Sequence, residues 1–309
     1  MTSTAKSHQD VMAVDALRKV AALAGSKGSS KEWPWLVPPS IVLSGVVLGA
    51  AIAIAAAEPP TAFPLCTPPA ASAAIAAGVA VSAAVAMADA VLDAGSWSWL
   101  GGFARSKISS TEPARELRFV MRPMNTHSSN ALVAAGVFVL ARTPHSRRAL
   151  TSAVYGGSLI AVGGLSYAWW ASRRRLAQRA DNLFMEVSMV ALGAHMAALA
   201  MPPSTEPWIV AAVAATTVIR GWTFLGEAAL PQCILLLWAS VLFAVARVGG
   251  IGALERLAVG WGLTLASVIA KAADVLDGYR WGTAVFHYLA GLSHVGLFLW
   301  AQTLPPLRE

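Results

Sequence analysis

The chain has 309 residues, of which 56% are hydrophobic and only 13% are charged, and its mean hydropathy is +0.59. A soluble domain of this length needs far more polar surface, so this composition excludes an ordinary soluble globular protein. The formal net charge of +7 does not indicate nucleic-acid binding, because the basic residues lie in short segments beside apolar runs. We therefore expect a helical integral membrane protein.

The N-terminal segment, residues 1–33, is polar and charged. Val11, Val14, Leu17 and Ala21 recur at helical spacing within it, which is typical of a short amphipathic helix on a membrane surface. Because no apolar run stands in this segment, we expect no cleavable signal peptide.

Nine apolar segments follow, each near the ~20 residues that cross a bilayer. Two of them, at 35–57 and 71–93, form an added N-terminal pair within 34–94, and a polar loop at 95–125 separates this pair from a core at 126–303. The seven core segments lie at 126–141, 149–170, 182–201, 208–224, 230–246, 257–273 and 282–303. The pattern predicts an all-α, polytopic helical bundle with a short C-terminal tail at 304–309.

The basic residues predict the orientation of this bundle. Most of the 23 Lys and Arg fall on one side of a nine-span arrangement, which places the N-terminus inside and the C-terminus outside. The run "SRRRLAQR" at 172–179 is typical of an inside-facing topology signal that contacts anionic lipid or a partner protein. The run "ARTPHSRRAL" at 141–150 places three arginines on the outside, against the positive-inside rule. A re-entrant segment before this run would reverse the orientation of all later spans.

Polar residues inside apolar spans are rare, and they are the candidates for function. Lys271, Asp274 and Asp277 end the eighth span, and Lys271 with Asp274 is spaced for an ion pair on one helix face. That pairing is a simpler interpretation of Lys271 than a retinal Schiff base. An ion path through these three residues, as in a transporter or receptor, is a third interpretation. His195 and His294 each fit an interhelical hydrogen bond.

Three motifs resemble those of the alkaline ceramidases, a branch of the CREST superfamily of seven-span membrane hydrolases, over roughly residues 112–303. The segment "NTHSSNALVAAGVFVLA" at 125–141 is similar to the Asn-Thr-x-Ser-Asn opening of that family, with one residue inserted. Ser166 ends the second core span, and Asp181 follows in an Asp-x-Leu-x-Met context. "FHYLAGLSH" at 286–294 is similar to His-x-x-x-His-x-Leu-x-Gly.

The resemblance implies a zinc ion held by three histidines, which activates water to attack a lipid amide with help from a Ser and an Asp. The family serine falls on Ser166 and the aspartate on Asp181, but the histidine positions fall on Trp170, Thr283 and His287. Catalytic zinc needs three protein ligands, and an indole offers no lone pair to a metal. The resemblance therefore implies a hydrolase core that has lost its zinc site.

Two replacements for the missing ligands are conceivable. His294 is seven residues from His287, about 10.5 Å along a helix, which is too far for both rings to meet one ion. A rearranged site of His195, His287 and Asp181 stays open, and it would make the protein a zinc-dependent lipid-amide hydrolase.

We predict a non-catalytic, ceramidase-like membrane protein with no resident metal or cofactor. Its expected role is an accessory or structural subunit of a larger membrane complex, photosynthetic or respiratory, that contacts lipid, pigment and other membrane subunits but no nucleic acid. The former catalytic cavity would hold a lipid chain or be filled by an indole. Its candidate residues are Ser166, Trp170, Asp181, His195, Thr283 and His287.

Overall fold

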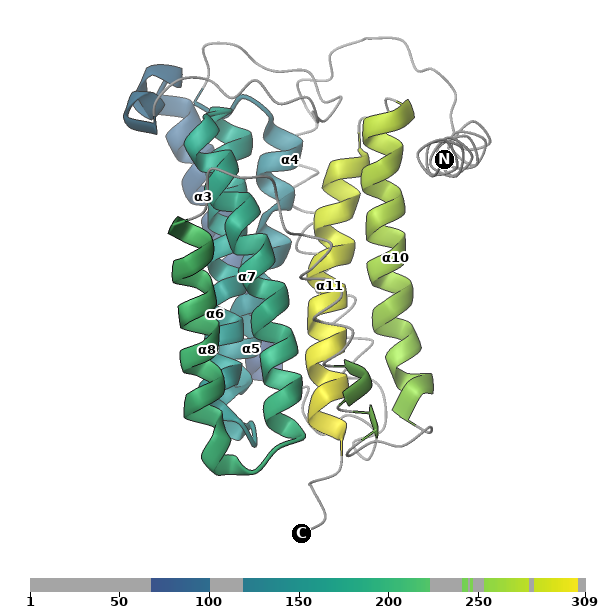
Figure 1. Cartoon of the computed structure of the whole chain (residues 1–309). Coiled ribbons are helices and arrows are strands. Elements are labelled where there is room, and N and C mark those ends of the chain that lie inside the picture. The colour runs from purple at the N-terminus through teal and green to yellow at the C-terminus, as the bar shows by residue number, and fades with distance from the viewer. Residues whose placement is uncertain are drawn as a thin grey trace, which may run out of the picture.

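The computed structural model describes residues 68–100, 119–222, 241–243, 245–246, 253–277 and 281–304, which form a bundle of long helices (Figure 1). Every regular element in these residues is helical, which confirms the predicted all-α fold class. In chain order the elements are α3 (Pro68–Val91), η1 (Ala94–Leu100), α4 (Pro123–Ser128), α5 (Asn130–Arg142), η2 (Thr143–His145), α6 (Ala149–Ser172), α7 (Arg175–Leu199), η3 (Pro203–Thr205), α8 (Glu206–Trp222), α10 (Ala253–Asp277) and α11 (Gly282–Thr303).

Three of these helices, α6, α7 and α11, are long and apolar enough to cross a membrane. Helices α3, α8 and α10 also coincide with predicted spans. The predicted span at 35–57, most of the span at 230–246, and the N-terminal segment 1–33 lie outside the described residues, as does the side chain of Asp277. The count of nine spans therefore stays a prediction.

The largest differences from the predicted helix boundaries are at α7 and in the first core span. Helix α7 begins at Arg175 rather than at 182, because Arg, Leu, Ala and Gln are good helix formers and the basic run continues the helix. The first core span is divided into α4 and α5, since Ser129 stands in a tightened turn where Ser129 N donates to Thr126 O and Leu132 N donates to Ser129 O.

Helix α6 is central to the bundle and packs against both α5 and α7, while α11 packs against α5 and α10. Glycines bring α5 and α6 into close contact. A methyl group at Gly136 would lie 2.6 Å from the Gly156 carbonyl oxygen, and one at Gly163 would lie 2.8 Å from the Val133 nitrogen. Small residues of this kind let two backbones approach closely.

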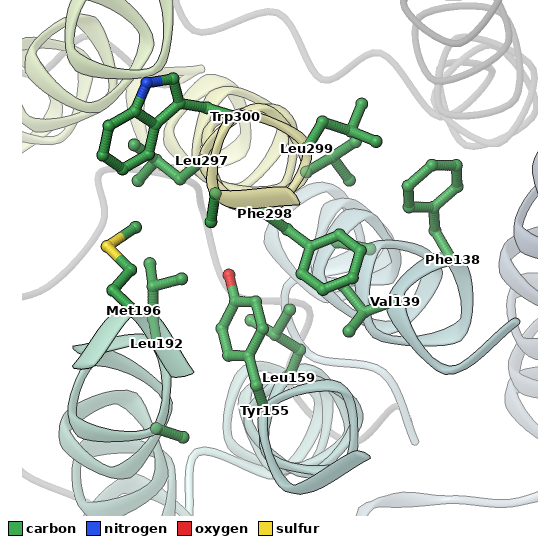
Figure 2. Close-up of a cluster of buried hydrophobic side chains, with 14 of the residues drawn as sticks. Phe138, Val139, Tyr155, Leu159, Leu192, Met196, Leu297, Phe298, Leu299 and Trp300 are labelled. Atoms are coloured by element: carbon green, nitrogen blue, oxygen red, sulfur yellow. The ribbon is translucent and has the colours of Figure 1, made fainter. Parts of the chain in front are cut away.

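Side chains from α5, α6, α7 and α11 form one apolar core (Figure 2). Phe138, Leu192 and Phe298 are fully buried there. Tyr155 reaches across this core, and its hydroxyl lies 2.7 Å from His294 Nδ1. His294 therefore makes the interhelical hydrogen bond expected of a lone histidine in an apolar helix.

Helix α3, from the added N-terminal pair, packs on α5 of the core. The amide of Asn130 donates to the hydroxyl of Ser82. Farther along, the backbone nitrogen of Val120 donates to Asp89 Oδ1 at 2.8 Å. The added helix is thus joined to the core by hydrogen bonds as well as by apolar contact.

Candidate functional site

Five of the predicted site residues lie together where α4 packs against α6 and α11. They come from α6, α7 and α11, which are far apart in the sequence and adjacent in space. All five are buried: Ser166, Trp170, Asp181, Thr283 and His287. A polar cluster of this kind, enclosed by long apolar helices, is costly unless its members satisfy one another.

His287 is held by hydroxyl groups at both ring nitrogens. Its Nδ1 lies 2.7 Å from Ser128 Oγ, and its Nε2 lies 3.5 Å from Ser166 Oγ. The Ser128 hydroxyl donates to the carbonyl of Asn125 at 3.0 Å. The network therefore favours the tautomer in which Nδ1–H donates to Ser128 and Nε2 is an acceptor.

The turn between α4 and α5 supplies the serines of this network. Consecutive residues on a tightened turn point in different directions, so Ser128 Oγ contacts His287 while Ser129 Oγ lies 3.2 Å from Ser166 Oγ. Both hydroxyls also donate to the carbonyl of Asn125, three and four residues earlier. These local bonds orient the two serines from within their own turn.

Thr283 sits between a cation and a carboxylate of α10. Lys271 Nζ donates to Thr283 Oγ1 at 2.7 Å. Asp274 Oδ2 accepts from the backbone nitrogen of Thr283 at 3.0 Å and also from its hydroxyl. Gly282 makes this possible, because a side chain there would collide with the Asp274 Cβ at 2.6 Å. The start of α11 is thus capped by α10.

The Lys271 ammonium also lies over an aromatic ring, with Nζ 5.0 Å from the centre of the Trp170 ring. Asp181 contributes a second carboxylate, which interacts electrostatically with Lys271 and hydrogen-bonds Ser166. The Trp170 ring in turn lies 6.4 Å from the ring of His287. One ammonium group therefore joins the two positions, Trp170 and Thr283, at which the resemblance implies metal ligands.

His195 does not belong to this cluster. Its Nδ1 lies 3.0 Å from Thr151 Oγ1 and its Nε2 lies 2.8 Å from the Gln302 amide. Asp181 and His195 are fourteen residues apart on α7, about 21 Å along the helix axis. A single ion cannot contact both side chains, so the structure gives no support to the rearranged metal site.

The described part of the chain contains no group of three or more His, Cys, Asp or Glu placed to hold a metal ion. The donor set around His287 is instead made of hydroxyls and an ammonium, which favour hydrogen bonding over coordination of a transition metal. Such a set can hold one histidine in a fixed tautomer, and it can neutralise two carboxylates.

Sequence reasoning found five members of the cluster and missed two, Ser128 and Ser129. It named Lys271 and Asp274 but did not place them in this cluster. The sequence does carry a signal for these two serines, because they lie within the motif "NTHSSN" that opens the first core span. At helical spacing both fall on the turn that faces the other spans. The spacing of Lys271 and Asp274 indicates a pair on one helix face. In the structure Lys271 and Asp274 interact electrostatically, and both also hydrogen-bond Thr283 of the next helix.

Comparison of the chain with protein-family models, with curated proteins and with solved structures found no match.

Proposed function

We propose that this chain is a non-catalytic membrane protein with a ceramidase-like core, in which the Lys271 ammonium takes the place of a metal cation. The observation that carries the proposal is the position of Lys271 Nζ, 2.7 Å from Thr283 Oγ1 and 5.0 Å from the centre of the Trp170 ring. These two residues stand where the resemblance implies two zinc ligands.

Electrostatics supports a metal-free site. The ammonium lies among the carboxylates of Asp181 and Asp274, so it supplies the positive charge that a metal ion would otherwise supply. A cation entering about 4 Å from this ammonium would meet a repulsion of about 4 kcal/mol per unit charge at the effective dielectric constant of a protein. The ammonium therefore compensates the carboxylates without zinc, and its own charge repels a second cation.

The bulk of Trp170 supports the loss of hydrolysis. Among the described residues Trp170 is the largest fully buried side chain, with 1% of its surface exposed. A lipid amide and an attacking water would both need space beside His287, and an indole is far larger than an imidazole. We propose that this indole fills the former catalytic cavity.

The outer surface of the bundle supports a role as a subunit. Large apolar side chains are exposed on α3, α8 and α10, among them Met87, Trp208, Val218 and Leu265. Exposed apolar faces on long helices are suited to contact with lipid or with other membrane helices. We propose that these faces hold the chain in a larger membrane complex.

The test uses the full chain purified in mild detergent, with metal analysis and an assay for hydrolysis of ceramide. We expect no stoichiometric zinc and no amide hydrolysis. Zinc at one ion per chain, lost in His287→Ala and retained in His294→Ala, would overturn the proposal and establish the hydrolase. His294 is the matched control because it lies on the same helix but pairs with Tyr155.

The subunit role is tested separately by native gel electrophoresis of solubilised membranes. We expect the chain to migrate with a complex much larger than its own 32.1 kDa. Migration as a single small species would contradict this part of the proposal and leave the metal-free site unaffected.

A further inference from the structure

Three cationic groups surround the buried ring of Trp170. Besides Lys271, the guanidinium carbon of Arg173 lies 5.6 Å from the ring centre and that of Arg122 lies 6.0 Å from it. Asp181 and Asp274 face Lys271. Arg122 and Arg173 thus bring two further cationic groups to the same ring.

Arg173 has a like charge as its neighbour. Burial, followed by the proximity of Arg122, lowers the pKa of the Arg173 guanidinium to about 10, so the group is still charged at neutral pH. No acidic side chain among the described residues forms an ion pair with it. A partly buried cation beside another cation is unfavourable unless an anion joins them.

Hydrogen-bond donors without acceptors gather at the same place. Within the described residues, the indole nitrogens of Trp169 and Trp170 and the Nη1 of Arg173 are buried and have no hydrogen-bond partner. Neighbouring buried donors that all lack an acceptor are rare in folded proteins. Their common requirement is an oxygen that accepts several hydrogen bonds.

The backbone of Arg173 is also strained. Arg173 is the non-glycine residue with positive φ in the described chain, at 55°, and it ends α6 with its N–H donating to Trp169 O at 2.7 Å. Glycine is preferred at such a helix end, and side chains that persist there are found mostly at functional sites. The strain places the guanidinium 5.3 Å from the centre of the Trp169 ring.

The position of this group along the helices indicates the ligand. Arg173 lies between the ends of α6 and α7, two helices long and apolar enough to span a membrane. Headgroups of phospholipids lie at that level, and tryptophan and arginine are enriched there.

We propose that Trp169, Trp170 and Arg173, with Arg122 beside them, bind the phosphate of an anionic phospholipid headgroup. A guanidinium donates two parallel hydrogen bonds to a phosphate, and the indole N–H groups donate to its remaining oxygens. The proposal rests on the membrane placement in the proposed function and does not depend on the absence of zinc. It identifies one specific lipid site at the end of α6.

The test compares Arg173→Gly with the wild type. Glycine adopts the positive φ without strain, so this variant keeps or raises the thermal unfolding midpoint while it removes the guanidinium. Native mass spectrometry then measures retention of added phosphatidylglycerol against phosphatidylcholine. We expect the wild type to retain phosphatidylglycerol preferentially and Arg173→Gly to bind it roughly tenfold to a hundredfold more weakly.

Arg175→Gln is the matched control, because Arg175 is exposed and carries the same charge two residues away. It should retain phosphatidylglycerol as the wild type does. A second arm adds inorganic phosphate to protein in phosphatidylcholine alone and follows tryptophan fluorescence. A response that Arg173→Gly abolishes, without any lipid preference, would support the site and identify a soluble phosphate as its ligand. Equal lipid retention by wild type and Arg173→Gly, with no phosphate response, would overturn the proposal.

Discussion

The ammonium nitrogen of Lys271 lies 5.0 Å from the centre of the Trp170 ring, although the two residues are one hundred and one positions apart in the chain. A ring face attracts a cation, and the attraction grows when both groups are shielded from water. The carboxylates of Asp181 and Asp274 also interact with this ammonium, so one cation is shared by both carboxylates and by the Trp170 ring.

Replacing Lys271 with methionine should destabilise the protein. The change leaves the buried carboxylates of Asp181 and Asp274 without their common cation. Loss of one partner of a buried ion pair costs 3–5 kcal/mol, and we expect about 3 kcal/mol because Lys271 is itself partly exposed. Thermal unfolding in detergent, followed by near-ultraviolet circular dichroism, measures the effect.

The control for this prediction is the double variant Lys271→Met with Asp274→Asn. An asparagine can still accept the backbone N–H of Thr283 but carries no charge, so the double variant should recover part of the lost stability. If it unfolds at or below the temperature of the single variant, charge compensation is not the role of Lys271.

Restoring the histidines should restore zinc. In a triple variant with Trp170→His, Thr283→His and Lys271→Met, three imidazoles including His287 would face a space freed of the ammonium. Residues 283 and 287 are four apart on α11, which puts both rings beside one ion. We expect about one zinc per chain by elemental analysis, against none in the wild type.

Adding His287→Ala to the triple variant is the control, and it should abolish zinc binding. A triple variant that stays folded and binds no zinc would show that this cluster did not originate as a metal site.

The contact between α5 and α6 depends on Gly163. A methyl group there would lie 2.7 Å from Val133 Cγ2 and 2.8 Å from the Val133 nitrogen, and the backbone atom cannot move aside alone. Gly163→Ala should therefore cost about 1–3 kcal/mol of unfolding free energy. Gly164→Ala is the matched control because its methyl group meets nothing within 4 Å, and helix propensity predicts a gain of up to ~1 kcal/mol. Equal unfolding midpoints for the two variants would contradict this account.

The hydrophobic pattern predicted most of the described helices because apolar length is the strongest signal in a membrane sequence. The start of α11 at Gly282 and of α6 at Ala149 agreed with the predicted spans. The predicted start of α7 at 182 was wrong, because α7 begins at Arg175. A basic segment at a helix end can extend beyond the apolar layer and remain helical, so charge alone does not indicate a loop.

The site was harder to predict than the helices. The order of the motifs was enough to predict that Ser166, Asp181 and His287 belong to one site. No sequence pattern indicates which turn of α10 faces α11, so the position of Lys271 between Trp170 and Thr283 could be seen only in the packed structure. His195 could have been excluded from its spacing to Asp181 on one helix. The unpaired indoles of Trp169 and Trp170 have no signature in the sequence.

Glu206, at the other end of the bundle, should stabilise the fold through the hydrogen bonds that its Oε1 accepts rather than through its negative charge. Its Oε1 accepts from the backbone nitrogen of Thr151 at 2.9 Å and from the Thr151 hydroxyl at 3.0 Å, so α8 caps the first turn of α6. The same hydroxyl lies 3.0 Å from His195 Nδ1. Glu206→Ala should lower the free energy of unfolding by about 1–3 kcal/mol, because it leaves an N–H at the start of a helix without its acceptor.

Glu206→Gln is the control, because it retains a carbonyl oxygen at that place and should keep most of the stability in the same thermal unfolding measurement. If Glu206→Gln unfolds as early as Glu206→Ala, the carboxylate charge at the α6 N-terminus, rather than the hydrogen bond, carries the effect.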